Sequence, residues 1–91
     1  MKGIEFERIW RRILDYLGEI FQTVAGLDFV YRVQGDALNT NRTKYNLSKS
    51  NFRAAYELMP VPQPGKISQI TRGSSYVWAN LNDPRIKGDP Q

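Results

Sequence analysis

Apolar residues recur every three or four positions between residues 4 and 17. This spacing places side chains along one face of an α-helix, so the segment predicts an amphipathic helix. The predicted apolar face contains Phe6, Ile9, Trp10, Ile13, Leu14 and Leu17. We expect Gly18 to end the helix, because glycine readily adopts the left-handed conformation that follows many helix termini.

The apolar pattern changes to a period of two after Gly18, which is typical of β-strands. The alternation predicts strands at residues 20–24, 29–34 and 37–42. We therefore expect a three-stranded antiparallel meander with one apolar face, which the first helix covers.

Gly35 and Asp36 separate the second and third strands and are typical of the two-residue turns that close β-hairpins. A turn at these two positions determines the register of the hairpin. It pairs Val33 with Leu38 and Tyr31 with Thr40, and it pairs Arg32 with Asn39 on the opposite face.

A second helix is predicted to begin after Ser48, its N-cap, and to run to about Leu58. Leu47 and Phe52 occupy the positions of a hydrophobic staple, and we expect Pro60 to end the helix.

The last third of the chain leaves an alternative open. Residues 67–72 predict one or two helical turns, and residues 74–81 predict either a helix or a strand. The serines at the start of the second segment favour a helix and its propensities favour a strand; we favour the helix. The expected fold is a single α+β domain over residues 1–91, with an N-terminal helix packed on the meander and one or two short helices following.

The composition excludes several classes of active site. The 91 residues include no cysteine and no histidine, so Ser-His-Asp and Cys-His catalytic sets, Cys/His zinc sites and redox pairs are absent. Catalysis by carboxylates requires two or more converging acids, and the nine acids are scattered along the chain. We therefore expect no enzyme activity, no catalytic residue, no metal and no cofactor.

Positive charge is concentrated in the second part of the chain. Residues 1–36 carry five basic and six acidic residues, whereas residues 37–91 carry eight basic and three acidic residues. No acid occurs between Ala37 and Tyr56. Unneutralised positive charge attracts polyanions, so nucleic acid is the first partner to consider, and a solvated basic face that maintains solubility is the alternative.

A polar, basic stretch joins the meander to the start of the second helix. Cations, hydroxyls, amides and the N–H groups of a first helical turn are the donors that bind phosphate oxygens. The stretch predicts a nucleic-acid site at Arg42, Lys44, Lys49 and Arg53, with Asn41, Ser48, Ser50 and Asn51 as neutral donors. Such residues are also common in loops and caps, which is the structural alternative. Tyr45 either packs inward or stacks on a base, and we favour packing. Arg72 either holds an anion or belongs to a structural turn, and we favour the turn.

A protein-interaction subunit is the rival function. Exposed aromatic residues at Tyr76 and Trp78 would then form a protein contact, such as a homodimer interface. In either case we expect a cytoplasmic protein without a membrane partner. The first residues carry acids where a secretory signal needs an apolar stretch, and no segment approaches the roughly 18 apolar residues of a membrane span.

Several short segments spread over about residues 19–86 carry a resemblance. They are residues 35–38, 41–43, 47–52, 72–79 and 83–86. Together they resemble small bacterial or phage proteins of unassigned function. The resemblance implies a bacterial accessory protein and transfers no functional residue.

Overall fold

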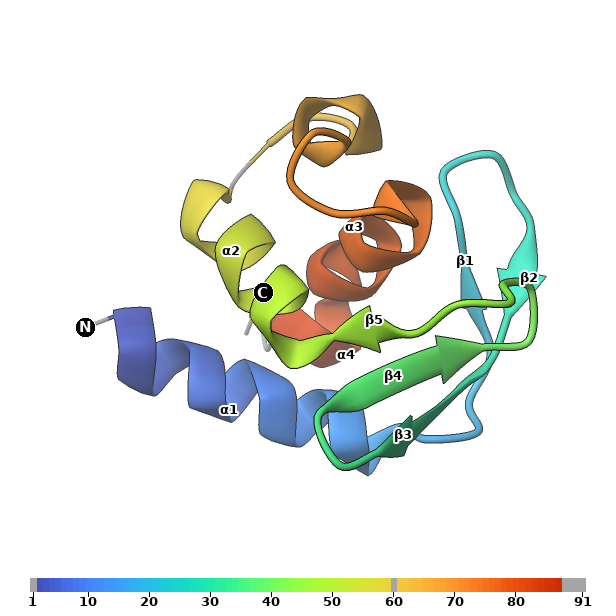
Figure 1. Cartoon of the computed structure of the whole chain (residues 1–91), viewed down its shortest axis with the longest axis horizontal. Helices are drawn as coiled ribbons and strands as arrows, with labels where there is room; N and C mark the ends of the chain where they lie inside the picture. Colours follow the sequence, from blue (N-terminus) through green and yellow to red (C-terminus); the bar gives the residue numbers. More distant parts are fainter. Residues whose placement is uncertain (1, 60, 88–91) are drawn as a thin grey trace.

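The computed structural model describes residues 2–59 and 61–87, with side chains from residue 5 onward. The predicted helix stop at Pro60 lies outside the described residues. The elements follow in the order α1 (Lys2–Asp15), β1 (Phe21–Gln22), β2 (Asp28–Phe29), β3 (Tyr31–Gln34), β4 (Ala37–Thr40), β5 (Leu47–Ser48), α2 (Lys49–Leu58), η1 (Pro64–Ile67), α3 (Ser74–Asn82) and α4 (Pro84–Lys87). An N-terminal helix, a three-stranded antiparallel sheet and further short helices form the expected α+β fold (Figure 1).

Helix α1 buries most of the predicted apolar face; Leu14 is partly buried and Leu17 is exposed. Phe6, Ile9, Trp10 and Ile13 are at most 5% exposed. Leu17 was expected in the core, but its side chain is 44% exposed. The helix ends at Asp15, and the chain turns away through Gly18, whose φ is 84°, so Leu17 no longer follows the helical stripe.

The β3–β4 hairpin has the predicted register. Tyr31 pairs with Thr40, Arg32 with Asn39 and Val33 with Leu38, and the turn lies at Gly35 and Asp36. Gly35 has a φ of 62°, a conformation that glycine adopts at little cost.

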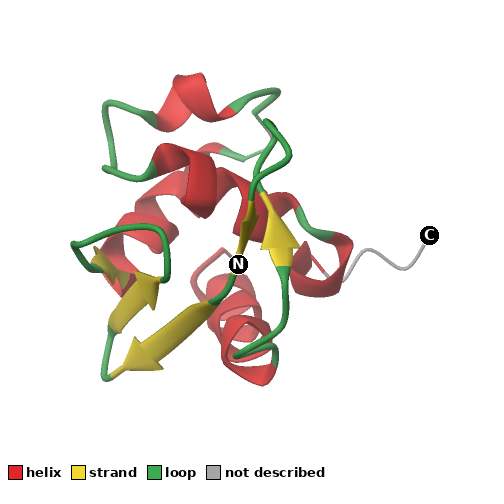
Figure 2. Ribbon diagram, turned by 90° about the vertical axis from the view of Figure 1, so that its right-hand side faces the viewer, coloured by secondary structure: helices red, strands yellow, loops and turns green. Residues whose placement is uncertain are grey.

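The third strand of this sheet is not the predicted one. Strand β5 pairs with β4, so the sheet order is β3-β4-β5. The predicted strand at residues 20–24 instead belongs to a separate two-stranded sheet, β1-β2, in which Phe21 pairs with Phe29. Backbone hydrogen bonds link Thr23 with Leu27 and with Gly26, which folds this segment back on itself. Figure 2 shows the two sheets as separate groups of strands.

The segment at residues 74–81, for which the sequence allows a helix or a strand, is helical. Residues 74–82 form α3, with Val77 and Leu81 buried as the helical alternative required. Helix α2 begins after its predicted N-cap, because the Ser48 hydroxyl accepts a hydrogen bond of 3.1 Å from the backbone N–H of Asn51. No helix within residues 2–59 and 61–87 is long and apolar enough to cross a membrane.

Arg85 holds α4 against the β1–β2 pair, which we call the first hairpin. Its guanidinium lies 4.0 Å from the centre of the Phe21 ring and donates a hydrogen bond of 3.0 Å to the Ile20 carbonyl. It also pairs with Asp83 at 2.9 Å. Burial alone would raise the pKa of Asp83, but the hydrogen bonds and the charge of Arg85 outweigh burial and hold that pKa below its usual value. Arg85 therefore stabilises the fold by joining α4 to the segment that contains Ile20 and Phe21.

Candidate nucleic-acid interface

Two of the predicted phosphate ligands face helix α1. Lys49 forms an ion pair of 3.1 Å with Glu7, and its ammonium lies 5.7 Å from the centre of the Trp10 ring. Arg53 lies 5.9 Å from the ring of Phe6 on the same helix. It also approaches the Glu57 carboxylate at 3.9 Å. The charges of Lys49 and Arg53 thus stand next to carboxylates, and both side chains help to hold α2 against α1.

Two of the predicted neutral donors have local partners. The Ser48 hydroxyl caps α2 through the Asn51 backbone N–H. The Asn41 side-chain oxygen accepts a hydrogen bond of 3.0 Å from the Val30 backbone N–H. Ser50 is exposed in the first turn of α2. The first turn of α2 therefore exposes the Ser50 hydroxyl, whereas the Ser48 hydroxyl is already engaged as the N-cap.

The loop between β4 and β5, residues 41–46, presents the other two predicted cations. Arg42 and Lys44 are exposed. The Arg42 side chain donates a hydrogen bond to the backbone carbonyl of Asp28. Its backbone N–H donates to the Thr40 hydroxyl at 3.1 Å, and the Thr43 hydroxyl donates to the Tyr45 carbonyl at 3.0 Å. These bonds give the loop a defined shape that carries two cations at the surface.

Arg72 extends this basic surface from a distant part of the chain. Its guanidinium lies 4.9 Å from the centre of the Tyr45 ring, and the ring itself is half-buried, as expected. Arg72 is exposed. Arg72 lies in a turn, as favoured above, but local sequence does not indicate its contact with Tyr45, because 27 positions separate the two residues. We call Arg42, Lys44 and Arg72 the loop cations.

The outer face of the three-stranded sheet continues from the loop. Arg32, Gln34, Asn39 and Asn46 are all exposed, and we call these four the sheet face. With Ala37 they line a depression of about 330 Å³. The Asn39 amide donates to the Asn46 side-chain oxygen at 3.1 Å, which ties the depression to the loop. The predicted register already placed Arg32 and Asn39 on one face, and that was the signal for this site.

The eight predicted residues thus fall in three places. Asn41, Arg42 and Lys44 lie on the β4–β5 loop, whereas Lys49 and Arg53 contact α1. Ser48, Ser50 and Asn51 stand at the start of α2 between these regions. The structure therefore divides the predicted site and adds Arg72 and the sheet face to its loop part.

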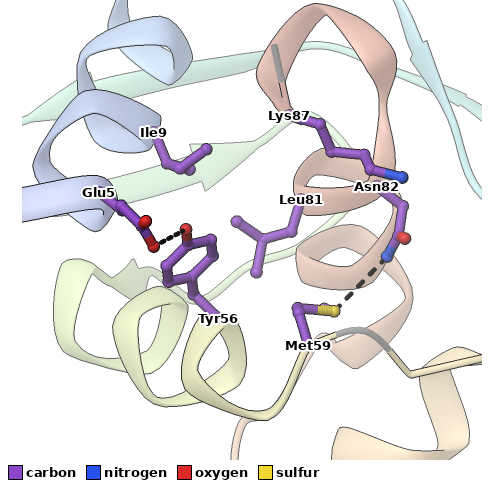
Figure 3. Close-up of a pocket in the computed structure, with 7 residues that line it drawn as sticks. All are labelled: Glu5, Ile9, Tyr56, Met59, Leu81, Asn82 and Lys87. Carbon is purple, nitrogen blue, oxygen red and sulfur yellow. Dashed lines mark hydrogen bonds between the residues drawn. The ribbon is translucent and has the colours of Figure 1, made fainter. Parts of the chain in front are cut away.

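The helices enclose a different, mainly apolar pocket of about 350 Å³, drawn in Figure 3. Its polar groups bond to one another: the Tyr56 hydroxyl donates to the Glu5 carboxylate at 3.4 Å, and the Asn82 amide lies 3.7 Å from the Met59 sulfur. Burial and the neighbouring Glu5 carboxylate raise the pKa of Tyr56. This pocket contains none of the predicted site residues.

The two aromatic residues expected to be exposed for a protein contact are only partly exposed. Tyr76 and Trp78 are half-buried. The Tyr76 ring packs edge-on against Phe29 at 5.1 Å, and the Trp78 indole N–H donates to the Val61 carbonyl at 3.0 Å. Exposed apolar surface lies instead near the first hairpin, where Leu17, Ile20, Val24 and Leu27 are 44% to 66% exposed.

Within the described part of the chain, no three acidic side chains converge as a possible metal-ligand group. No protein-family model, curated protein or solved structure matches the chain. The function is therefore inferred from the geometry of the surface alone.

Proposed function

We propose that the protein is a non-enzymatic nucleic-acid-binding module of the cytoplasm whose loop cations contact phosphate groups. The observation that supports this function is that the β4–β5 loop exposes Arg42 and Lys44 and that the exposed Arg72 lies over Tyr45 of the same loop. In the described part of the chain, none of the three pairs with a carboxylate. Exposed cations without local neutralisation are the ordinary partners of a phosphate backbone.

The loop cations differ in this respect from the other predicted ligands. Lys49 and Arg53 each stand beside a carboxylate and over an aromatic ring of α1. Moving either charge to a phosphate would break these contacts. The proposed interface therefore keeps Arg42 and Lys44, adds Arg72 and leaves out Lys49 and Arg53.

The dependence of binding on salt tests the proposal. Each phosphate contact contributes about 0.9 to the slope of log affinity against log salt on duplex DNA, so three contacts predict a slope of about −3. Replacing one loop cation with glutamine should flatten the slope by about one unit and weaken binding to all sequences alike. Fluorescence anisotropy with labelled duplex and single-stranded oligonucleotides measures both quantities.

A charge-matched pair of double variants provides the control. Arg42→Glu with Lys44→Glu reverses two loop cations, and Arg11→Glu with Lys66→Glu reverses two exposed cations on α1 and η1. Both pairs change the net charge equally, so only the position of the charge differs. The loop variant should lose binding and the control should retain most of it, with circular dichroism confirming that both fold.

Two results would contradict the proposal. One is equal binding by the two double variants, which would make the attraction a property of net charge. The other is no binding by the wild type even at low salt. In that second case a protein-interaction role becomes the better hypothesis, with the exposed aliphatic residues near the first hairpin as its surface.

A further inference from the structure

The sheet face presents planar hydrogen-bonding groups in an ordered array. Its four side chains are one guanidinium, Arg32, and three amides, Gln34, Asn39 and Asn46. Arg32 stands directly opposite Asn39 in the β3–β4 register. Guanidinium groups match the O6 and N7 acceptors of guanine, and Asn or Gln amides match the N6 and N7 groups of adenine. The face therefore carries the chemistry that recognises base edges.

Open aromatic rings are missing from this surface among the described residues. Single-stranded nucleic acid is usually held by bases stacked on such rings. Tyr31 borders a hollow beside the depression, but its side chain is 1% exposed and its hydroxyl donates to the Ile13 carbonyl. The Tyr45 ring is covered by Arg72. Hydrogen bonding to base edges therefore fits the face better than stacking.

The width of the β3–β4 hairpin favours the major groove. Its two strands, which carry Arg32, Gln34 and Asn39, form an antiparallel ribbon with axes about 4.8 Å apart. The major groove of B-form DNA is about 12 Å wide and admits a two-stranded β-ribbon, whereas the minor groove is only about 6 Å wide. The major groove of A-form RNA is too narrow for side chains to read.

We infer that the sheet face enters the major groove of duplex DNA and reads base edges there, while the loop cations hold the adjoining phosphates. This inference rests on the proposed function and names its substrate. Arg32 and Gln34, which have exposed side chains on β3, are the specificity-determining residues. The Asn39 amide nitrogen already donates to the Asn46 side-chain oxygen and to the Tyr45 carbonyl, which leaves the Asn39 oxygen and the Asn46 amide nitrogen for base edges. The loop lies at one end of the same sheet because it connects the antiparallel neighbours β4 and β5.

The test begins with selection from a random pool of 20-base-pair DNA duplexes. A face that reads base edges should enrich particular sequences over repeated rounds. The enriched duplex should bind at least about tenfold more tightly than its separated strands or the same sequence as duplex RNA. Replacing its purines with 7-deazapurines removes the N7 acceptors and leaves the phosphates unchanged. This replacement should weaken binding at least about fivefold, since one good base contact contributes about that much discrimination.

Variants of the sheet face connect the result to named residues. Arg32→Ala with Gln34→Ala should abolish the 7-deazapurine effect while the salt slope stays near −3, because phosphate contacts remain. The matched control, Arg8→Ala with Gln69→Ala, removes one exposed arginine and one exposed glutamine elsewhere and should leave the effect intact. The inference fails if no sequence is enriched, if single strands bind equally well, or if the sheet-face variant keeps the 7-deazapurine effect. A salt slope near −3 in those cases would leave the proposed function standing, whereas absence of binding would remove both.

Discussion

The packing of α1 yields a sharp comparison between two aliphatic residues of the predicted stripe. Ile13 is fully buried and Leu17 is 44% exposed. Truncating Ile13 to alanine removes three carbon atoms from water-excluded surroundings, at about 0.8 kcal/mol for each. The cavity left behind adds to this cost, so the free energy of unfolding should fall by about 2–5 kcal/mol. The Leu17→Ala change removes as many atoms from a half-solvated site and should cost about 1 kcal/mol or less.

Urea denaturation measures both costs. Tryptophan fluorescence provides one probe, because Trp10 belongs to the core beside Phe52, with ring centres 5.7 Å apart. Far-ultraviolet circular dichroism provides the second probe and tests whether unfolding is two-state. With an m-value of about 1–3 kcal/mol/M, Ile13→Ala should lower the midpoint by at least about 0.7 M. Equal midpoints for the two variants would refute the assignment of the buried face of α1.

Two further predictions concern the turn before α3 and the buried hydroxyl of the sheet. Gly73→Ala should destabilise the protein more than Gly35→Ala in thermal unfolding: both positions have positive φ, but only at Gly73 would the new Cβ crowd another atom, the Leu47 side chain at 3.0 Å. Equal shifts in Tm would contradict the close packing at Gly73. Burial, partly offset by the nearby Asn80 amide, raises the pKa of Tyr31 to about 12 from 10.0. The Tyr31 hydroxyl therefore loses its proton at a lower pH in the unfolded chain than in the folded protein. The free energy of unfolding should fall by about 2–3 kcal/mol between pH 10 and 12. Tyr31→Phe should remove most of that decrease, and an unchanged pH profile in the variant would contradict it.

Local features of the fold were predictable from neighbouring residues. The Ser48 cap depends on a hydroxyl and an N–H three positions apart, and the β3–β4 register depends on Gly35 and Asp36. Each of these interactions closes within a few residues, so the local sequence specifies it. The Arg42 and Lys44 part of the candidate site was also visible in this way, as a run of positive charge without acids.

Long-range contacts were decided only by the tertiary structure. Residues 47–48 pair with β4 because the β4–β5 loop brings them back beside that strand. The predicted strand at residues 20–24 instead contributes β1, which pairs with β2 in a separate hairpin. Lys49 meets Glu7, and Arg72 meets Tyr45, across 42 and 27 positions of chain. Periodicity indicates which face of an element is apolar, but not which element covers it. The sequence by itself therefore determined helices α1 and α2, the β3–β4 hairpin and the run of positive charge. Chain packing decided between helix and strand at residues 74–81 and decided which cations contact other elements, because contacts between distant segments form only once the chain has folded.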